Sequence, residues 1–265
     1  MDKASLAGAL LGLTAIFGGA VVEAGIALAT TIVYSHGAAV AFMVVFVGTA
    51  GAVCVQTKPE DLPKLKEGIG IIFSPAKMDY DGMYTLILDL AQKARREGIL
   101  ALEGAMNDVD NKFLEKALRL TIDGQEKSFI EDTLHTAILH ELEETKACAK
   151  IFDAIGGFGP TIGIMGAVLG LMATMGRLDS GDIALIGAGI QGAFVATLYG
   201  VGLANIVALP VGNKIKRHGE MREAFLEMIM TGVIGISEGL NPMLIQEKLE
   251  PYVHGDPKAA EEAAG

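Results

Sequence analysis

The stretch GGFGPTIGIMGAVLG, residues 156 to 170, decides which kind of fold this chain can adopt. It is uncharged and rich in glycine, and it lies inside a run from Ala154 to Gly176 that contains no charged residue. About twenty apolar residues suffice to cross a bilayer. In a water-soluble helix, Pro160 would remove a backbone hydrogen bond and the glycines would lower helix propensity. Neighbouring membrane helices can pack on such small positions and satisfy the freed backbone groups. We therefore predict a membrane-spanning helix, and the residues alone leave open whether it lines a path or only packs.

Three further uncharged runs divide the chain, namely Ala4–Val22, Ala24–Thr57 and Ile183–Asn213. Of the 265 residues 51% are hydrophobic, and the mean hydropathy is +0.43. Much of this chain therefore does not face water. The first run has no basic segment beyond Lys3 and no small-residue cleavage pattern. We expect it to remain as a span, because a removable signal peptide would carry both features.

The run Ala24–Thr57 is too long for one perpendicular helix. At about 1.5 Å per residue it would extend about 50 Å, against a hydrocarbon core of about 30 Å. The sequence Ser35, His36, Gly37 supplies a break. We predict a surface or re-entrant segment near Ala24–Ser35 and a second span from about Ala38 to Val55, which gives four spans in total.

The distribution of Lys and Arg predicts how these spans are oriented. Glu23–Gly37 contains neither residue, and the turn between the third and fourth spans contains only Arg177. In contrast, Lys58–Lys150 contains thirteen basic residues and Lys214–Lys258 contains six. Because basic residues are in excess on the cytoplasmic side, we expect a multi-pass membrane protein with both termini and the large loop in the cytoplasm.

The large polar loop has the pattern of a helical lobe. Apolar residues recur in it at three- and four-residue spacing, and Gly98 and Gly124 mark helix ends. No helix breaker interrupts Gln125–Ile155, so the last helix of the loop can continue into the third span. The recurring residues are Met83, Leu86, Ile87, Leu90, Ala91 and Ala94, then Phe113, Leu114, Ala117 and Leu118, then Ile130, Leu134, Ile138 and Leu142.

The predicted fold is an all-α membrane protein with four transmembrane helices, a large helical cytoplasmic loop between spans two and three, and a cytoplasmic C-terminal helix. Residues 1–57 hold spans one and two with an external interfacial segment, and residues 58–153 form the cytoplasmic helical domain. Residues 154–213 hold spans three and four. Residues 214–265 hold the amphipathic helix Lys214–Ile236 and an acidic tail, whose last ten residues we expect to be disordered.

Several function classes find little support in the residues. A net charge of −11 disfavours a nucleic-acid partner, because phosphate backbones select for clustered Lys and Arg. Cys54 and Cys148 form neither a disulfide framework nor a metal-ligand spacing. His135 and His140 are five residues apart and point to different helical faces, so we interpret them as surface residues. We predict no metal and no cofactor.

Gly187, Gly189 and Gly192 spell GxGxxG, the pattern of dinucleotide-binding loops. Here the pattern lies inside an apolar run, with no strand–helix–strand context and no acidic residue in the twenty positions that follow. We interpret these glycines as positions of close helix packing. Since no nucleophile–base set or phosphate loop is present either, the chain is not predicted to be an enzyme.

Spans three and four contain no ionisable residue. Such residues mark ion paths, because charge at bilayer depth is costly, so any ion carried here needs a carboxylate from another protein. The spans offer only hydroxyl groups and prolines, namely Thr161, Thr174, Thr197, Tyr199, Pro160 and Pro210. Helix packing and hydrogen bonds to the preceding turn would explain each of these residues equally well.

Four segments carry a resemblance to a known family. They are PTIGIMGAVLGL at Pro160–Leu171, GAFVATLYGVGLANIVALPVGNKIK at Gly192–Lys216, KARREGILALE at Lys93–Glu103, and EGLNPMLIQEKL at Glu238–Leu249. Together they resemble the MotA/TolQ/ExbB superfamily over nearly the whole chain. Four spans with a large loop between the second and third are typical of its flagellar stator branch, whereas the TolQ and ExbB branch has three.

The resemblance implies a pentameric ring in the bacterial inner membrane around a dimer of MotB, whose single transmembrane helix supplies the ion-carrying carboxylate. Pro160 and Pro210 correspond to the family's two channel-side prolines, with Thr161 beside the first. Thr197 corresponds to the hydroxyl that faces the ion path. Arg95 and Glu103, eight residues apart, correspond to the charged pair that engages the rotor protein FliG; without the resemblance, charges there would simply be solvated.

The resemblance also bears on which ion is carried. Sodium-type relatives tend to have a threonine seven residues after the first proline, where this chain has Ala167, so a proton is favoured over sodium. The B subunit or Thr197 could decide the ion instead. The implied function is an ion-driven stator subunit that converts ion flow into torque. The alternatives are a TolQ/ExbB-type energiser of an outer-membrane system and a membrane scaffold that conducts no ion.

Overall fold

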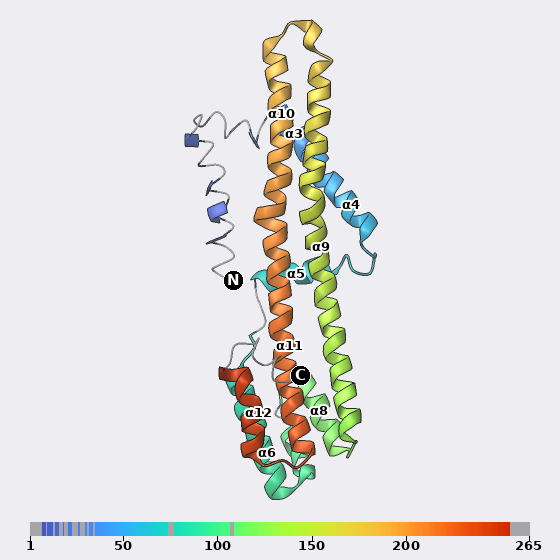
Figure 1. Ribbon diagram of the computed structural model, residues 1–265, viewed down its shortest axis with the longest axis vertical. Helices are drawn as coiled ribbons and strands as arrows, with labels where there is room; N and C mark the ends of the chain where they lie inside the picture. Colours follow the sequence, from blue (N-terminus) through green and yellow to red (C-terminus); the bar gives the residue numbers. More distant parts are fainter. Residues whose placement is uncertain are drawn as a thin grey trace. The chain divides into compact units, whose positions relative to one another are not determined.

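The computed structural model describes residues 35–73, 77–106 and 109–254, together with scattered positions between Ala7 and Val33. Within these ranges every regular element is a helix, which confirms the predicted all-α class (Figure 1). The first predicted span, Ala4–Val22, and the segment Ala24–Ser35 lie largely outside the described residues. The last ten residues of the acidic tail lie wholly outside them.

Three helical stretches are long and apolar enough to cross a membrane: His36–Gln56, Lys127–Met175 and Ile183–Ser237. They contain the second, third and fourth predicted spans. The last helix of the loop does continue into the third span, because α9 (Lys127–Met175) is one helix of 49 residues. The fourth span likewise continues into α11 (Leu209–Ser237).

The chain divides into two compact units, and α9 and α11 contribute residues to both. The span unit comprises residues 1–75 and 145–216, and the loop unit comprises residues 76–144 and 217–265. These limits differ from the predicted domain 58–153, because residues 58–75 and 145–153 belong to the span unit. Residues 58–75 include α5 (Lys64–Phe73), a helix that was not predicted from the sequence.

Helix α5 is fixed within the span unit at Gly68. A Cβ at this position would lie 2.6 Å from Cys148 Sγ and 2.8 Å from Ile215 Cδ1, so a larger residue would have to displace these side chains. The thiol of Cys148 also donates to the carbonyl oxygen of Lys64 at 3.1 Å. These contacts hold the segment that follows the second span against α9 and α11.

The second span consists of α3 (His36–Phe42), the π-helical turn η1 (Met43–Val47) and α4 (Gly48–Gln56). Ser35 begins it with extended backbone, and its Oγ accepts a hydrogen bond from the Ala38 amide at 3.0 Å. The predicted break is therefore confirmed at Ser35 but is wrong at His36 and Gly37, which are helical. Gly37 instead allows a close approach, since its Cβ would lie 2.8 Å from the Cα of Gly192.

The loop unit is built from α6 (Tyr80–Glu97), η2 (Ile99–Leu102), α7 (Glu103–Met106), α8 (Lys112–Ile122), α12 (Pro242–His254) and the adjoining parts of α9 and α11. Gly98 ends α6 with φ of 88°, and Gly124 follows α8 with φ of 67°, so both predicted helix ends are confirmed. Tyr80 donates to the carbonyl oxygen of Met221 at 2.6 Å, and burial raises the pKa of this phenol.

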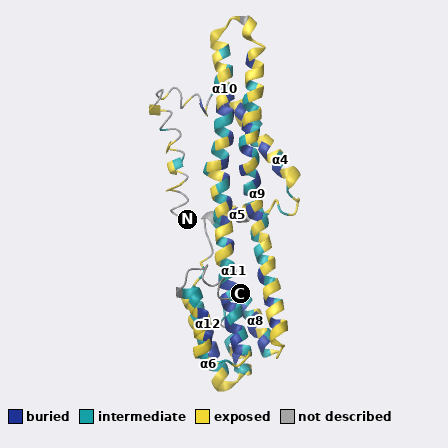
Figure 2. Ribbon diagram, in the orientation of Figure 1, coloured by how far each residue is buried: buried dark blue, intermediate teal, exposed yellow. Residues whose placement is uncertain are grey.

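Large apolar side chains fill the centre of the loop unit. Nine of the predicted apolar positions are buried there, and residues of α11 and α12 complete the core. Figure 2 shows the buried residues gathered along these helices. The nine are Ile87, Leu90, Ala91, Leu114, Ala117, Leu118, Ile130, Leu134 and Ile138; Phe225, Leu226, Met228, Ile229, Val233 and Ile236 come from α11, and Ile245 and Leu249 from α12.

Candidate functional site

In the span unit, α9 and α10 (Ile183–Gly202) run side by side and are joined by the turn Arg177–Asp182 (Figure 1). Small residues make their contact. A Cβ at Gly163 would lie 2.9 Å from the carbonyl oxygen of Ala196, and a Cβ at Gly170 would lie 3.2 Å from the Cβ of Ala193. We call this contact the glycine seam; it consists of Gly159, Gly163, Gly166 and Gly170 on α9 and Gly189, Ala193, Ala196 and Gly200 on α10.

The spacing of the seam explains why the opening stretch of sequence is so rich in glycine. Its α9 members follow one another by three or four residues and therefore lie on one helical face. The absence of side chains lets the two backbones approach closely, which is how helices associate in lipid. The packing interpretation of GxGxxG is confirmed at Gly189, which abuts Thr174, and at Gly192, which abuts Gly37. A Cβ at Gly187 would meet nothing within 4 Å, so the structure shows no close packing at this glycine.

Pro160 and Thr161 lie beside the seam on α9. Helix α9 continues through Pro160, which directly follows the seam residue Gly159 and is half-buried. Since proline has no N–H, it cannot donate to the carbonyl oxygen of Gly156. The Thr161 hydroxyl is exposed and donates to the carbonyl oxygen of Phe158 at 2.9 Å. The backbone hydrogen bonding of α9 is thus loosened next to an exposed hydroxyl.

Thr197 and Pro210 lie on the partner helix of the seam. Thr197 directly follows the seam residue Ala196 and is half-buried. Pro210 is exposed at the start of α11 and directly follows the π-helical turn η4 (Leu203–Ala208) and Leu209. A π-helical turn accommodates a residue that cannot make the regular bond four positions back, and such turns are frequent at functional sites. The predicted ion-path residues therefore lie on α9 and on the continuous helical stretch α10, η4 and α11.

Ala167 follows Pro160 by two helical turns and is also half-buried. The neighbouring surface of α9 is apolar and exposed in the single chain. Its residues are Ile164, Met165, Val168, Leu169 and Met172, each at least half exposed. An apolar surface of this kind faces lipid or another protein.

An ion pair lies beyond the Gly159 end of the seam, next to the limits of the uncharged runs Ala154–Gly176 and Ile183–Asn213. Lys216 Nζ lies 2.7 Å from Asp153 Oδ2, and the missing side chain of Gly212 makes room for the Asp153 carboxylate. Neither residue was predicted from the sequence to have a role. The signal that could have identified the pair is that Asp153 and Lys216 flank the two runs predicted to pack on each other.

Arg95 and Glu103 lie in the loop unit. Arg95 is in the last turn of α6, Glu103 is the first residue of α7, and the buried Leu102 fixes the connection between them. Both side chains are exposed, and neither forms an ion pair with any residue that the structure describes. Two uncompensated opposite charges on a rigid frame can contact a charged partner surface.

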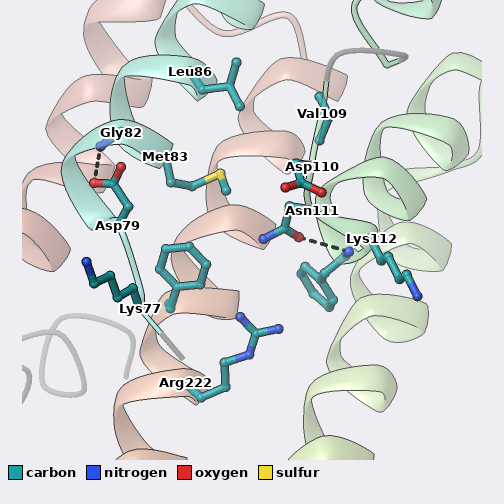
Figure 3. A pocket seen from close by; sticks show the side chains of 12 residues that line it. Lys77, Asp79, Gly82, Met83, Leu86, Val109, Asp110, Asn111, Lys112 and Arg222 are labelled. Atoms are coloured by element: carbon teal, nitrogen blue, oxygen red, sulfur yellow. Dashed lines mark hydrogen bonds between the residues drawn. The ribbon is translucent and has the colours of Figure 1, made fainter. Parts of the chain in front are cut away.

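A pocket of about 600 Å³ lies among α6, the segment before α8 and α11, and Figure 3 shows its lining. Some of its polar side chains already serve the fold. Asp79 Oδ1 accepts from the Gly82 amide at 3.0 Å, and Arg222 donates to Glu141 at 2.7 Å. The lining includes none of the predicted site residues. Among the described residues, no group of three or more His, Cys, Asp or Glu side chains could hold a metal ion.

The chain is similar to proteins of known type along almost its full length. The family model of the MotA/TolQ/ExbB proton channel family matches residues 105–228. Motility protein A of Bacillus subtilis (strain 168) is 33% identical over 254 residues, which cover 96% of this chain and 91% of that protein.

Two solved structures share the fold. The structure of C. jejuni MotAB matches with a TM-score of 0.87 and 28% identity, covering 97% of this chain and 98% of that one. The flagellar MotAB stator complex from Bacillus subtilis matches with a TM-score of 0.85 and 31% identity over the whole of both chains. The protein described here therefore belongs to the MotA/TolQ/ExbB proton channel family, as a membrane subunit of the flagellar stator type.

Proposed function

We propose that this chain forms a transmembrane ion channel together with a dimer of a MotB-type B subunit and converts ion flow into torque on the rotor protein FliG. The observation that carries the proposal is the glycine seam. It packs α9, which carries Pro160, against α10, which carries Thr197 and continues through η4 to Pro210 at the start of α11. A path with hydroxyl groups and prolines but no carboxylate requires the B subunit to supply the ion-binding acid.

The exposed apolar surface of α9 supports an assembly. Residues such as Met165 and Met172 would meet either lipid or protein, and a B-subunit helix beside Pro160 would cover part of this surface. We infer a homo-oligomeric ring, a pentamer, with the loop unit and both termini in the cytoplasm. The transported ion is a proton in preference to sodium, and we propose no cofactor for the complex.

The mechanism follows from charge at bilayer depth. Protonation of the B-subunit carboxylate beside Pro160 and Thr197 removes its charge, and release of the proton restores it. Each elementary charge that crosses gains about 2.3 kcal/mol per 100 mV, which suffices to step the ring past several weak contacts. Because α9 and α11 contribute residues to both units, a movement in the span unit is carried along continuous helices.

The proposal is tested by measuring ion flux into cells that express this chain together with the B subunit encoded beside it. The segment of the B subunit that plugs the channel is deleted, so that the channel stays open. We expect proton flux that disappears when the B-subunit aspartate is replaced by asparagine. Sodium flux in its place would reverse the ion assignment made from Ala167. A complex that assembles but conducts no ion would favour the alternative of a membrane scaffold. If deletion of the gene abolished uptake and left swimming intact, a TolQ/ExbB-type role would be favoured.

The rotor contact has its own test. We expect Arg95→Glu and Glu103→Lys to reduce swimming several-fold, while flux through the unplugged complex is retained. Contacts between exposed charges are weak and screened by salt, which suits a contact that must form and break at every step. If both reversals swim normally, Arg95 and Glu103 do not contact the rotor.

A further inference from the structure

Asp153 and Pro160 lie on the same face of α9. Seven residues make almost two full turns of a helix that has about 3.6 residues per turn, so Asp153, Pro160 and Ala167 follow one another along one stripe. Helix α9 is a single α-helix from Lys127 to Met175, and the stripe therefore runs through it without interruption. At about 1.5 Å per residue, Asp153 lies about 10 Å along the helix from Pro160. A carboxylate is thus placed on the face for which an ion path is proposed.

Asp153 is also the first acid beyond the uncharged part of the helix pair. Residues 154–178 and 183–219 contain no Asp or Glu, so α10, η4 and the first part of α11 carry no acid at this end. With the loop unit placed in the cytoplasm, as proposed above, Asp153 stands at the cytoplasmic end of the span. A proton that moves from Pro160 toward the cytoplasm therefore reaches Asp153 as the first carboxylate on these helices.

The surroundings of Asp153 hold one of its oxygens and leave space beside the other. Lys216 Nζ lies 2.7 Å from Oδ2, and a Cβ at Gly212 would lie 3.1 Å from Oδ1. Because glycine has no Cβ, no side chain of this residue presses on Oδ1. The Asp153 side chain is 37% exposed, so water can reach it. A carboxylate that is held in place and accessible to water can accept a proton and release it again.

The pair of Asp153 and Lys216 has a simpler interpretation as an anchor at the limit of the spans. A lysine at such a limit keeps its ammonium group out of the apolar layer, and an ion pair exposed to this degree contributes at most about 1 kcal/mol. An anchor needs an acid opposite Lys216. It does not need that acid to be aligned with Pro160 and Ala167, and this alignment favours a role in the path.

We propose that Asp153 accepts the transported proton at the cytoplasmic exit of the ion path. This inference rests on the proposed function, and it adds an acid of this chain to a path whose other acid belongs to the B subunit. Carboxylates serve as proton relays in membrane proteins that move protons. Here the relay has one member on each subunit type.

The transfer is balanced in protons and charge. The B-subunit carboxyl group beside Pro160 gives its proton to water and becomes a carboxylate, and water passes a proton to Oδ1 of Asp153. The Asp153 carboxylate thereby becomes a carboxylic acid. It returns to the carboxylate when the proton leaves to water on the cytoplasmic side. Lys216 positions the group by binding its other oxygen and takes up no proton itself.

Proton flux through the unplugged complex, measured per assembled complex, tests this role. Asp153→Asn keeps the size of the side chain but removes the proton acceptor, and it should lower flux at least about tenfold, a modest share of what a positioned acid or base contributes. Asp153→Glu keeps the carboxyl group and should retain most of the native flux. Glu60→Gln is the matched control, because it removes an exposed carboxylate from the turn between α4 and α5 in the same unit; it should conduct normally.

Lys216→Gln distinguishes a proton acceptor from an anchor. It breaks the same ion pair as Asp153→Asn but leaves the carboxylate in place, so it should lose much less flux. Equal losses in Asp153→Asn and Lys216→Gln would mean that the pair only anchors the helices, and the proposal would be overturned. It would also be overturned if Asp153→Glu conducted no better than Asp153→Asn.

The native complex in the same assay separates this inference from the proposed function. If the native unplugged complex conducts no ion, the proposed function fails and this inference falls with it. Sodium flux without proton flux would overturn both the ion assignment and the role of Asp153. If the native complex conducts protons and Asp153→Asn conducts equally well, only this inference is wrong.

Discussion

The two units of this chain are packed in opposite ways. The loop unit buries large side chains such as Ile87, Leu134 and Ile229 completely. In the span unit the helices meet through Gly163, Gly170 and Ala196, and large apolar residues such as Met165 stay exposed (Figure 2). Water drives large apolar side chains together, whereas lipid does not, so helices in lipid associate through close backbone packing. Helix α9 shows both kinds of packing: its first part contributes large side chains to the core of the loop unit, and its later part packs through glycines in the span unit.

The comparison predicts the largest effect in the loop unit. Leu134→Ala should lower the free energy of unfolding by about 2–5 kcal/mol, because it leaves a cavity in a core where the side chain is 0% exposed. Pulse proteolysis of the loop unit in the purified complex would measure this. Leu139→Ala, on the exposed side of the same helix, should change it by less than about 0.5 kcal/mol. Equal effects would contradict the assigned core.

In the span unit, the addition of a methyl group, and not the removal of one, should destabilise the packing. Gly163→Ala places a Cβ against the carbonyl oxygen of Ala196 and the Cα of Gly200, neither of which can move without shifting a helix. We expect a loss of about 1–3 kcal/mol, seen as a lower thermal stability and yield of the assembled complex. Gly157→Ala, six residues earlier in the same helix, meets nothing within 4 Å and should be neutral or stabilising.

The charges at the end of the seam should contribute least. The Asp153 and Lys216 side chains are 37% and 44% exposed, so their coupling energy should be within about 1 kcal/mol and should decrease with salt. A double-mutant cycle with Asp153→Asn and Lys216→Gln measures this energy from thermal unfolding of the complex. A coupling several times larger, or one that salt leaves unchanged, would mean that charge rather than packing holds this end of the seam.

Periodicity predicted the loop unit well because burial in water follows helical spacing. The positions Ile87, Leu118 and Ile138 are buried as expected. It could not reveal α5 or the separate α12, since both depend on tertiary contacts. Helix α5 packs through Gly68 against Cys148, and α12 places Ile245 and Leu249 in the core of the loop unit.

The sequence predicted which residues of which helices form the site. It did not predict the contacts and the helix geometry around them. Pro210 marks a disturbance in the run Ile183–Asn213 but does not specify the π-helical turn η4 before it, because a proline can also be accommodated by a kink or by the end of a helix, and packing decides among these. The pairing of Asp153 with Lys216 and the packing of Gly163 against Ala196 each join segments far apart in the chain. Hydrophobic spacing within a single helix carries no information about such contacts.

The most direct test of the central claim, that the helix pair of the glycine seam lines the ion path, is proton flux through the unplugged complex carrying Pro160→Ala. Alanine restores the hydrogen bond to Gly156 and favours the helix, so the account predicts an assembled complex with flux at least about tenfold lower, the loss of roughly 1.4 kcal/mol of stabilisation along the path. Gly157→Ala should conduct normally. Native flux in an assembled Pro160→Ala complex would contradict the claim and leave the seam as packing alone.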